Sequence, residues 1–323
     1  MKKKNFTPAG RLPQMLLGAA LCITMFLSAG CAGDGVPEDG DSNPDGRVAL
    51  QVSGGINVQT RAHDAQWDKD DQIGIYMYAA GTTTIAEGVN NIPYELADVG
   101  NSKFAPSGTT IYFPIDGSNV DFHVWYPYTD VTAGAWTADL TDQSSQAALD
   151  LMTADAKSDT QEGGTVYNKE KFIVALKFSH RLSKLVLNIT PGTGISAADL
   201  EGLKVELTQQ WKTVSYDPEY EAIGFTEELA TIPLLTKANG TFAEAILFPD
   251  DLTRKTLTTG RQLVFTLKST NEVFRWDIPA AKSFNAGDKN IYDITINHRT
   301  LDVTATISDW NKGNGNGESG SAE

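Results

Sequence analysis

Apolar residues recur at every second position along most of the chain after residue 46. Val48, Leu50 and Val52 form one such series near the start of this region, and Leu301, Val303, Ala305 and Ile307 form another near its end. This period of two is typical of half-buried β-strands. Further strands are predicted at Ile73–Met77, Thr110–Phe113, Val120–Val124, Phe172–His180, Lys184–Ile189, Leu203–Thr208, Ala243–Phe248, Gln262–Leu267, Val273–Ile278 and Asn290–Ile296.

Clusters of Gly, Pro, Asn and Asp separate these short strands, and only Ser196–Leu200 has a helical pattern. Many short alternating strands favour an all-β fold built from β-sandwiches. The 264 residues from Arg47 to Trp310 are too many for one small sandwich. We therefore predict two tandem domains, at residues 47–190 and 191–310, divided at the breaker cluster Thr190–Gly194.

The apolar pattern changes phase shortly before that boundary. Apolar side chains lie at even positions up to Leu182 and at odd positions from Leu185 to Ile189. A one-residue insertion moves every later side chain to the other face of a sheet. A bulge or a tight turn is therefore predicted near Ser183.

The N-terminus has the pattern of a lipoprotein signal. Four positive charges precede an apolar run of 13 residues, Met15–Leu27, and Ser28–Gly30 and Cys31 follow it. Such a run is too short to span a membrane comfortably, and small residues before a cysteine are typical of lipoprotein signals. We predict that residues 1–30 are a signal peptide, and that a covalent lipid such as palmitate on Cys31 anchors the chain in the outer membrane.

Two segments have compositions that cannot build a core. Residues 31–46 are rich in Gly, Asp, Glu and Pro, and residues 311–323 are rich in Gly, Asn and Ser. The first is predicted to be an acidic flexible tether, and the second a disordered tail.

Charge and reactive residues exclude several function classes. Loss of the signal changes the formal net charge from −15 to −19, which argues against nucleic acid as a partner. One cysteine remains, so no disulfide within the chain is expected. The four histidines lack metal-ligand spacing and no nucleophile motif is present. We expect no metal, no cofactor besides the lipid, and no enzymatic activity.

Several motifs, in this order, resemble the fimbrillins, which are subunits of type V pili of Gram-negative anaerobes and include Mfa-like lipoproteins. The similarity spans Arg47 to Trp310. The motifs that carry it are Thr60–Ala62, Trp67, Asp71–Tyr76, Asn91–Tyr94, Ile111–Pro114, Val120–Tyr128, Phe178–Leu185, Ala286–Lys289 and Leu301–Trp310. Asp70 departs from the family pattern, which has glycine before the aspartate.

The resemblance implies two transthyretin-like β-sandwiches and assembly by strand exchange. Fimbrillins are exported as lipoproteins and cut after an arginine by an arginine-specific surface protease. The cut removes the first strand, and a strand from another pilus subunit fills the groove by β-strand addition. The chain would thus move from the outer membrane surface into the fimbrium.

Arg61 is the predicted cleavage site, with Arg47 as second choice. A cut at Arg61 would remove the groove-filling strand with Val48, Leu50 and Val52, whereas a cut at Arg47 would remove only the tether. Either arginine could instead be an ordinary surface residue, as in anchor subunits that escape cleavage.

The donor-strand candidate comprises Leu301, Val303, Ala305 and Ile307, which share an apolar face. The segment could equally be the last strand of its own domain. The role as stalk, tip or anchor and the host or bacterial ligand of a tip stay open. The alternative function is a surface glycan-binding lipoprotein that uses Trp125–Tyr128, Trp136 and Trp211 as an aromatic platform.

Overall fold

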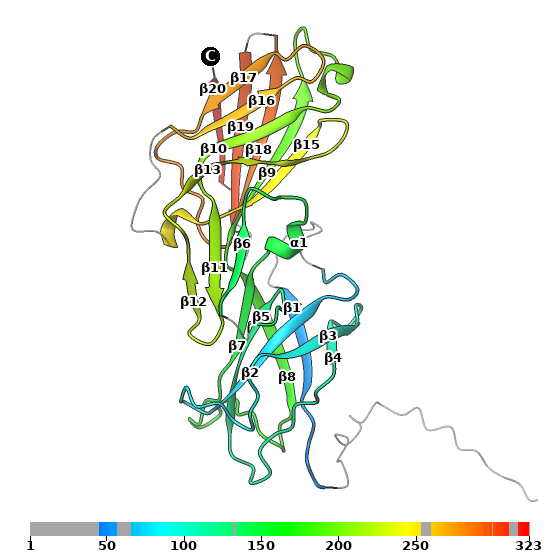
Figure 1. Cartoon of the computed structure of the whole chain (residues 1–323), viewed down its shortest axis with the longest axis vertical. Coiled ribbons are helices and arrows are strands. Elements are labelled where there is room, and N and C mark those ends of the chain that lie inside the picture. The colour runs from blue at the N-terminus through cyan, green and yellow to red at the C-terminus, as the bar shows by residue number, and fades with distance from the viewer. Residues whose placement is uncertain are drawn as a thin grey trace, which may run out of the picture. The chain divides into compact units, whose positions relative to one another are not determined.

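Almost every regular element of the chain is a β-strand (Figure 1). In the computed structural model the described residues are 45–56, 66–131, 134–252, 260–298, 300–309 and 316–322. They lie within one compact unit that begins at Asp39. The all-β fold class predicted from the sequence is confirmed, while its transthyretin-like detail stays a prediction.

Seven strands close into a barrel in the N-terminal half. Their order around the barrel is β1 (Gln51–Ile56), β4 (Lys103–Pro106), β3 (Ile92–Asp98), β2 (Gln72–Ala79), β5 (Val120–Tyr126), β7 (Met152–Ala156) and β8 (Ile173–His180). The barrel closes because β1 pairs antiparallel with β4 and parallel with β8. Its interior holds one apolar core, which includes Ile73, Phe122 and Phe178.

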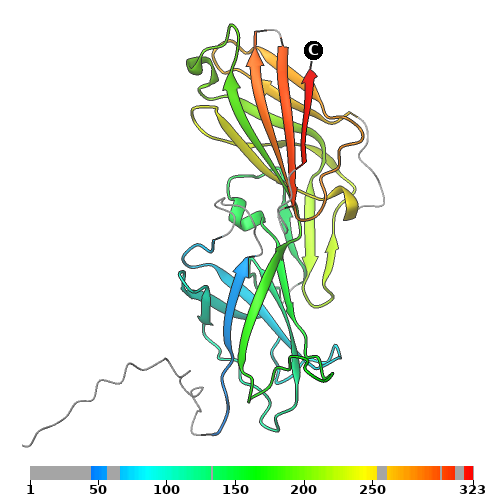
Figure 2. The same cartoon turned by 180° about the vertical axis from the view of Figure 1, so that it is seen from behind.

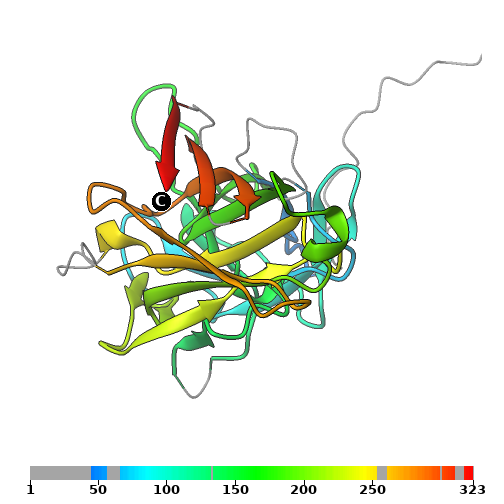
Figure 3. The ribbon, with the colours of Figure 1, turned by 90° about the horizontal axis from the view of Figure 1, so that it is seen from above.

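Two further sheets share a second core. The six-stranded sheet has the order β14 (Leu235–Thr236), β15 (Phe242–Leu247), β9 (Ser183–Pro191), β18 (Asp288–Asn297), β19 (Thr300–Asp309) and β20 (Asn316–Ala322). The four-stranded sheet has the order β13 (Leu229–Pro233), β10 (Lys204–Trp211), β16 (Gln262–Thr266) and β17 (Val273–Asp277). Figure 3 shows β18, β19 and β20 side by side in orange to red.

A small three-stranded sheet links the two cores. It contains β12 (Ala222–Gly224), β11 (Thr213–Asp217) and β6 (Trp136–Asp139), so it pairs strands from before and after residue 190. Tyr216 of β11 belongs to the second core, together with Trp125 of barrel strand β5. Burial of these side chains therefore joins the barrel to the rest of the unit.

The helices among the described residues are short. They are α1 (Gln146–Leu149), which Ser145 caps by accepting a hydrogen bond from the backbone N–H of Ala148, and the 3₁₀ turns η2 (Ala197–Leu200) and η3 (Asp250–Leu252). No described stretch forms a helix with the length and apolar character needed to cross a membrane.

Strand β9 differs from the predicted domain division. The sequence placed it before a boundary at residue 190, but β9 pairs with β15 and β18 of the six-stranded sheet. The predicted turn near Ser183 is confirmed, since β8 ends at His180 and β9 begins at Ser183. At this turn the chain leaves the barrel and enters the six-stranded sheet. This change of sheet accounts for the change of phase in the apolar pattern.

Two further local predictions are wrong. Thr110–Phe113 makes only an isolated bridge, between Tyr112 and Ala49. The segment 311–323, predicted to be disordered, contains β20, which pairs antiparallel with β19 from Leu301 to Ile307 (Figure 2). Backbone hydrogen bonds to an available sheet edge require no apolar side chains, so composition alone did not reveal this strand.

Candidate functional site

Strand β1 fills one position in the barrel wall. Val52 lies opposite Phe104 of β4 on one side and Val174 of β8 on the other. The side chains of Leu50 and Val52 are buried, with 5% exposure each, while Val48 is half-buried. The predicted groove-filling series thus lies in one segment, although regular strand structure begins only at Gln51.

The residues before β1 are also held by the barrel backbone. The N–H of Leu50 donates to the carbonyl of Ile111 at 2.9 Å, and the N–H of Phe113 donates to the carbonyl of Val48 at 3.0 Å. The N–H of Gln51 donates to the carbonyl of Phe172 at 3.1 Å. Backbone pairing with the barrel therefore includes the residues from Val48 to Ile56.

Gly54 is the point of closest approach between β1 and the aromatic core. Trp67 donates from Nε1 to the carbonyl of Gly54. The Trp67 ring packs edge to face against Phe104 and Phe178, with centroid separations of 5.1 Å for each pair. A Cβ atom on Gly54 would lie 2.7 Å from Cε2 of Phe178. This position in the wall therefore favours the smallest residues, and anything larger than glycine requires the Phe178 ring to move.

The end of β1 borders a cavity of about 190 Å³. Ile56, Trp67, Tyr126 and Met152 contribute to its lining. The Tyr126 hydroxyl donates to Asp71 Oδ1 at 2.9 Å, and burial raises the pKa of Asp71 despite this hydrogen bond and one from the backbone of Asp68. Hydrogen-bonded polar groups therefore lie beside the C-terminal end of β1.

The backbone conformation of Asp70, which precedes Asp71, explains how an aspartate can stand where the family pattern has glycine. Its backbone has a φ of +73°, in the left-handed region that glycine adopts most readily. Aspartate is one of the few other residues that tolerate this region. The turn therefore keeps the conformation that a glycine would take.

Of the two predicted cleavage sites, Arg47 lies among the described residues and Arg61 does not. Arg61 lies in the segment 57–65, between β1 and Trp67, outside the described residues, as does Cys31. The Arg47 side chain is 43% exposed, lies 3.5 Å from Asp45 and covers the ring of Tyr112. Arg47 precedes the whole segment 48–56, so a cut there would leave β1 attached.

The predicted donor segment forms β19 within the chain's own sheet. Leu301, Val303 and Ala305 are buried, with exposures of 2%, 3% and 7%. The β19 backbone pairs with β18 along ten residues and with β20 on its other side. Ile307 belongs to the strand, but its side chain lies outside the described residues. In the single chain this segment is therefore an internal strand.

The aromatic residues predicted as a glycan platform are core residues. Trp125 is fully buried, and Trp136 and Trp211 are only 6% and 4% exposed. Trp125 also donates from Nε1 to Asn91 at 2.9 Å. The platform of the alternative function is therefore not exposed at these three tryptophans, which are core residues.

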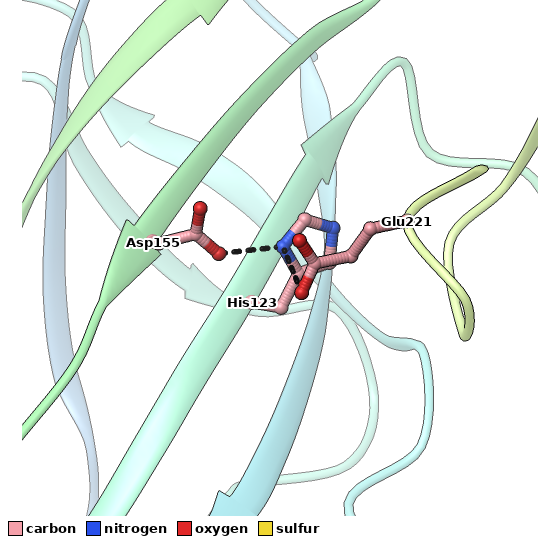
Figure 4. Close-up of side chains that lie close together, drawn as sticks. All are labelled: His123, Asp155 and Glu221. Carbon is pink, nitrogen blue, oxygen red and sulfur yellow. Dashed lines mark hydrogen bonds and ion pairs between the residues drawn. The ribbon is translucent and has the colours of Figure 1, made fainter. Parts of the chain in front are cut away.

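A second polar cluster lies at the linking sheet (Figure 4). His123 Nδ1 of β5 is 2.7 Å from Asp155 Oδ1 of β7 and 3.7 Å from Glu221 Oε1, in the turn between β11 and β12. His123 Nε2 is 2.7 Å from the hydroxyl oxygen of Tyr216. Burial acts to raise the pKa of Asp155, but the hydrogen bond and charge of His123 hold it below its usual value.

Sequence spacing did not reveal this cluster. Asp155 lies 32 positions from His123 and Tyr216 lies 93 positions away, so no local motif connects them. Another histidine, His180, is buried with Nδ1 at 2.7 Å from Asp150 Oδ1.

Comparison with known proteins gives consistent matches. The model of the Fimbrillin-like family matches residues 60–310. A Bacteroides uniformis protein provisionally named fimbrium subunit Fim1C is 36% identical over 97% of this chain and 100% of its own length.

Two solved structures share the fold. One, provisionally described as a cell adhesion protein from Bacteroides uniformis, is 33% identical, with a TM-score of 0.68 over 82% of this chain and 99% of its own. The other, a similarly described protein from Bacteroides ovatus, is 20% identical, with a TM-score of 0.62 over 82% of this chain and 98% of its own.

Proposed function

Because the chain belongs to the Fimbrillin-like family, we propose that it is a structural and adhesive subunit of a type V pilus at the cell surface. The relatives named as a fimbrium subunit and a cell adhesion protein support this role. In the proposal, the precursor is exported as a lipoprotein with its lipid on Cys31. An arginine-specific protease then cuts after Arg61, and the chain assembles by strand exchange.

The observation that carries the proposal is the position of β1. It is the first strand among the described residues and lies between β4 and β8, so the segment that contains Arg61 is its covalent link to the other barrel strands. After a cut at Arg61, noncovalent contacts alone would hold the segment 48–56. The family match begins at residue 60, after β1, as expected if the assembled form lacks this strand.

Loss of β1 would create a groove with a strong tendency to be refilled. Each fully buried aliphatic side chain contributes roughly 1.5–3 kcal/mol, and Leu50 and Val52 are both buried. The edges of β4 and β8 would also lose their backbone partner, and unpaired edges recruit strands. A donor strand from another subunit would restore both the hydrogen bonds and the apolar contacts.

The predicted donor has the same pattern as the strand that it would replace. Leu50, Val52, Gly54 and Ile56 alternate as large, large, small and large, and Leu301, Val303, Ala305 and Ile307 alternate in the same order. Aligned in this register, Ala305 takes the place of Gly54, where the space is most restricted. The register thus places the smallest apolar side chain of the donor against Phe178. The donor would leave its pairing with β18 and β20 when it enters the groove.

The first experiment tests cleavage and assembly together. The full-length protein is treated with an arginine-specific protease, and the products are followed by N-terminal sequencing and gel electrophoresis. We expect a new N-terminus at Ala62 and a ladder of oligomers that grows with protein concentration. The Arg61→Lys variant should give neither, whereas Arg47→Lys should behave like the parent. Equal laddering by Arg61→Lys would contradict the proposal.

The second experiment tests the register. A peptide with the sequence of residues 300–309 is added to the cleaved protein, and binding is measured by fluorescence anisotropy. An Ala305→Leu peptide should bind at least tenfold more weakly, because its larger side chain meets the Phe178 and Phe104 rings. A Thr304→Leu peptide is the matched control, because Thr304 lies on the exposed face of β19. Equal affinity of the Ala305→Leu and parent peptides would exclude the proposed register.

A further inference from the structure

We propose that His123, Asp155 and Glu221 form a binding site for a divalent transition-metal ion such as Zn²⁺. The candidate ligand atoms, one from each residue, lie within 4.8 Å of one another. Imidazole nitrogen together with carboxylate oxygen suits first-row transition metals, whereas Ca²⁺ and Mg²⁺ prefer oxygen ligands alone.

The burial of the three residues fits a site that is open on one side. The His123 side chain is 3% exposed, whereas those of Asp155 and Glu221 are 41% and 47% exposed. Both carboxylates approach the same ring nitrogen, Nδ1, as Figure 4 shows. All three residues line a cavity of about 600 Å³. The cavity gives an ion a path of entry and leaves room for water to complete its coordination.

The other ring nitrogen of His123, Nε2, already has a hydrogen-bond partner. Tyr216 lies 2.7 Å from Nε2, so with an ion on Nδ1 the proton of the imidazole would lie on Nε2 and be donated to the Tyr216 oxygen. A hydrogen bond of this kind sets the tautomer and orientation of a metal-binding histidine. For the neutral ring, binding at Nδ1 would shift the proton to Nε2 without net release, whereas an imidazolium would release its Nδ1 proton to solvent.

An unpartnered hydroxyl in the same cavity is a second, independent sign of a ligand. Tyr78 is only 8% exposed and lines the cavity. Its hydroxyl is buried and has no hydrogen-bond partner among the residues that the structure describes. Buried polar groups are almost always hydrogen-bonded. Rotation of the Tyr78 side chain toward the cavity would let a water bound to the ion supply the partner that this hydroxyl lacks.

The backbone at Glu221 has a conformation that a test of the site can use. Glu221 has a φ of +52°, a left-handed conformation that glutamate rarely adopts. Strained residues of this kind occur preferentially at ligand and active sites. A glycine would take this turn position without strain, so the glutamate keeps its place at a conformational cost.

The charges that surround the cavity favour a cation. Asp121, Asp155, Glu219 and Glu221 line the cavity, and Lys157 is the basic residue among the lining residues described. Asp121 is engaged by the backbone N–H groups of Gly81 and Ser158, at 2.8 Å and 2.7 Å. The carboxylates of Asp155 and Glu221 are the ones directed at His123.

Calorimetric titration of the metal-free full chain with ZnCl₂ tests the site. We expect a saturable Zn²⁺ site whose affinity falls at least tenfold in Asp155→Asn and in Glu221→Gln. The matched control is Glu219→Gln, because Glu219 lines the same cavity but lies outside the cluster. His298→Gln is a second control, since His298 approaches Glu272 elsewhere, at 3.6 Å. Both controls should retain the parent affinity.

A backbone-compatible variant separates binding from folding. Glu221→Gly should keep or raise the melting temperature without metal, because glycine accepts the positive φ, yet it should lose the Zn²⁺ affinity. The proposal is overturned if the parent shows no saturable binding, if Glu221→Gly and Asp155→Asn bind Zn²⁺ like the parent, or if Ca²⁺ binds more tightly than Zn²⁺. The site does not depend on strand exchange, so it stands or falls separately from the proposed function.

Discussion

Strands β1 and β19 have the same apolar pattern but are held by different means. β1 has six residues and closes a barrel, with Gly54 and Trp67 in close contact at its centre. β19 has ten residues and lies in an open sheet, paired with β18 along its whole length. The difference shows that side-chain fit limits what can occupy the β1 position, whereas a long ladder of hydrogen bonds secures β19.

The largest expected loss of stability comes from placing a charge on the buried face of β19. Val303→Asp should lower the free energy of unfolding by roughly 3 kcal/mol or more, because the carboxylate would lie in the second core without a partner. Urea denaturation measures the change. Thr304→Asp, on the exposed face of the same strand, is the control and should change stability by less than about 0.5 kcal/mol. Similar losses in both variants would mean that β19 has no buried face.

The next largest effect is a loss of stability that should depend on whether the chain has been cut at Arg61. Leu50→Ala should destabilise the uncleaved chain by roughly 2–4 kcal/mol, because a buried aliphatic side chain is removed from the barrel. After cleavage at Arg61 and release of the N-terminal fragment, the same substitution should have no effect on the remaining chain. Thermal melts before and after proteolysis measure both values. A persistent effect after cleavage would show that β1 stays bound.

A pair of neighbouring glycines tests the close fit of β1. Gly54→Ala should cost roughly 1–3 kcal/mol, since the added Cβ would meet Phe178 at 2.7 Å. Gly55→Ala is the matched control, because its nearest neighbour is the Leu176 carbonyl oxygen at 4.0 Å. Chemical denaturation of both variants decides the comparison. Equal stabilities would show that the Phe178 ring does not restrict the strand.

The smallest effect is a pH dependence near the end of β1. Burial raises the pKa of Asp71 above 3.8, so the folded chain favours the protonated carboxyl. The contribution of Asp71 to stability is then fully present below about pH 3.8 and is lost as the pH rises through the raised value. Asp71→Asn should remove this part of the slope when unfolding is measured from pH 3.5 to pH 7. An unchanged slope would assign the pH dependence to other groups.

Alternation predicted the long strands well because their burial is regular. β8 and β17 bury every second residue, and both were expected within one or two residues of their observed ends. β6, β11 and β12 were missed because they are short and owe their structure to pairing across the two halves of the chain. The sheet to which β9 belongs could not be read from local pattern, since its partners lie about 60 and 105 residues away.

In the candidate sites too, residues were predicted correctly where their own segment determines their burial, and contacts between distant segments were missed. Leu50 and Val52 were identified from their own segment and are buried as expected. Trp67 was part of a recognised motif, but its contact with Gly54 depends on how β1 packs against the barrel core. His123 and Glu221 meet only because β11 and β12 fold back toward the barrel. Contacts of this kind have no signature in residue spacing.

Under the proposed strand exchange, the missing side chain at Gly54 would also affect selectivity among competing strands. Specificity is a difference between affinities, and rejection of wrong partners can supply most of it. Many surface proteins carry alternating apolar segments that could pair with an open barrel edge. A wall that tolerates almost no volume at one position would turn most of them away. The composition of the fibre would then be decided by steric exclusion at a single residue, before any adhesive contact is made.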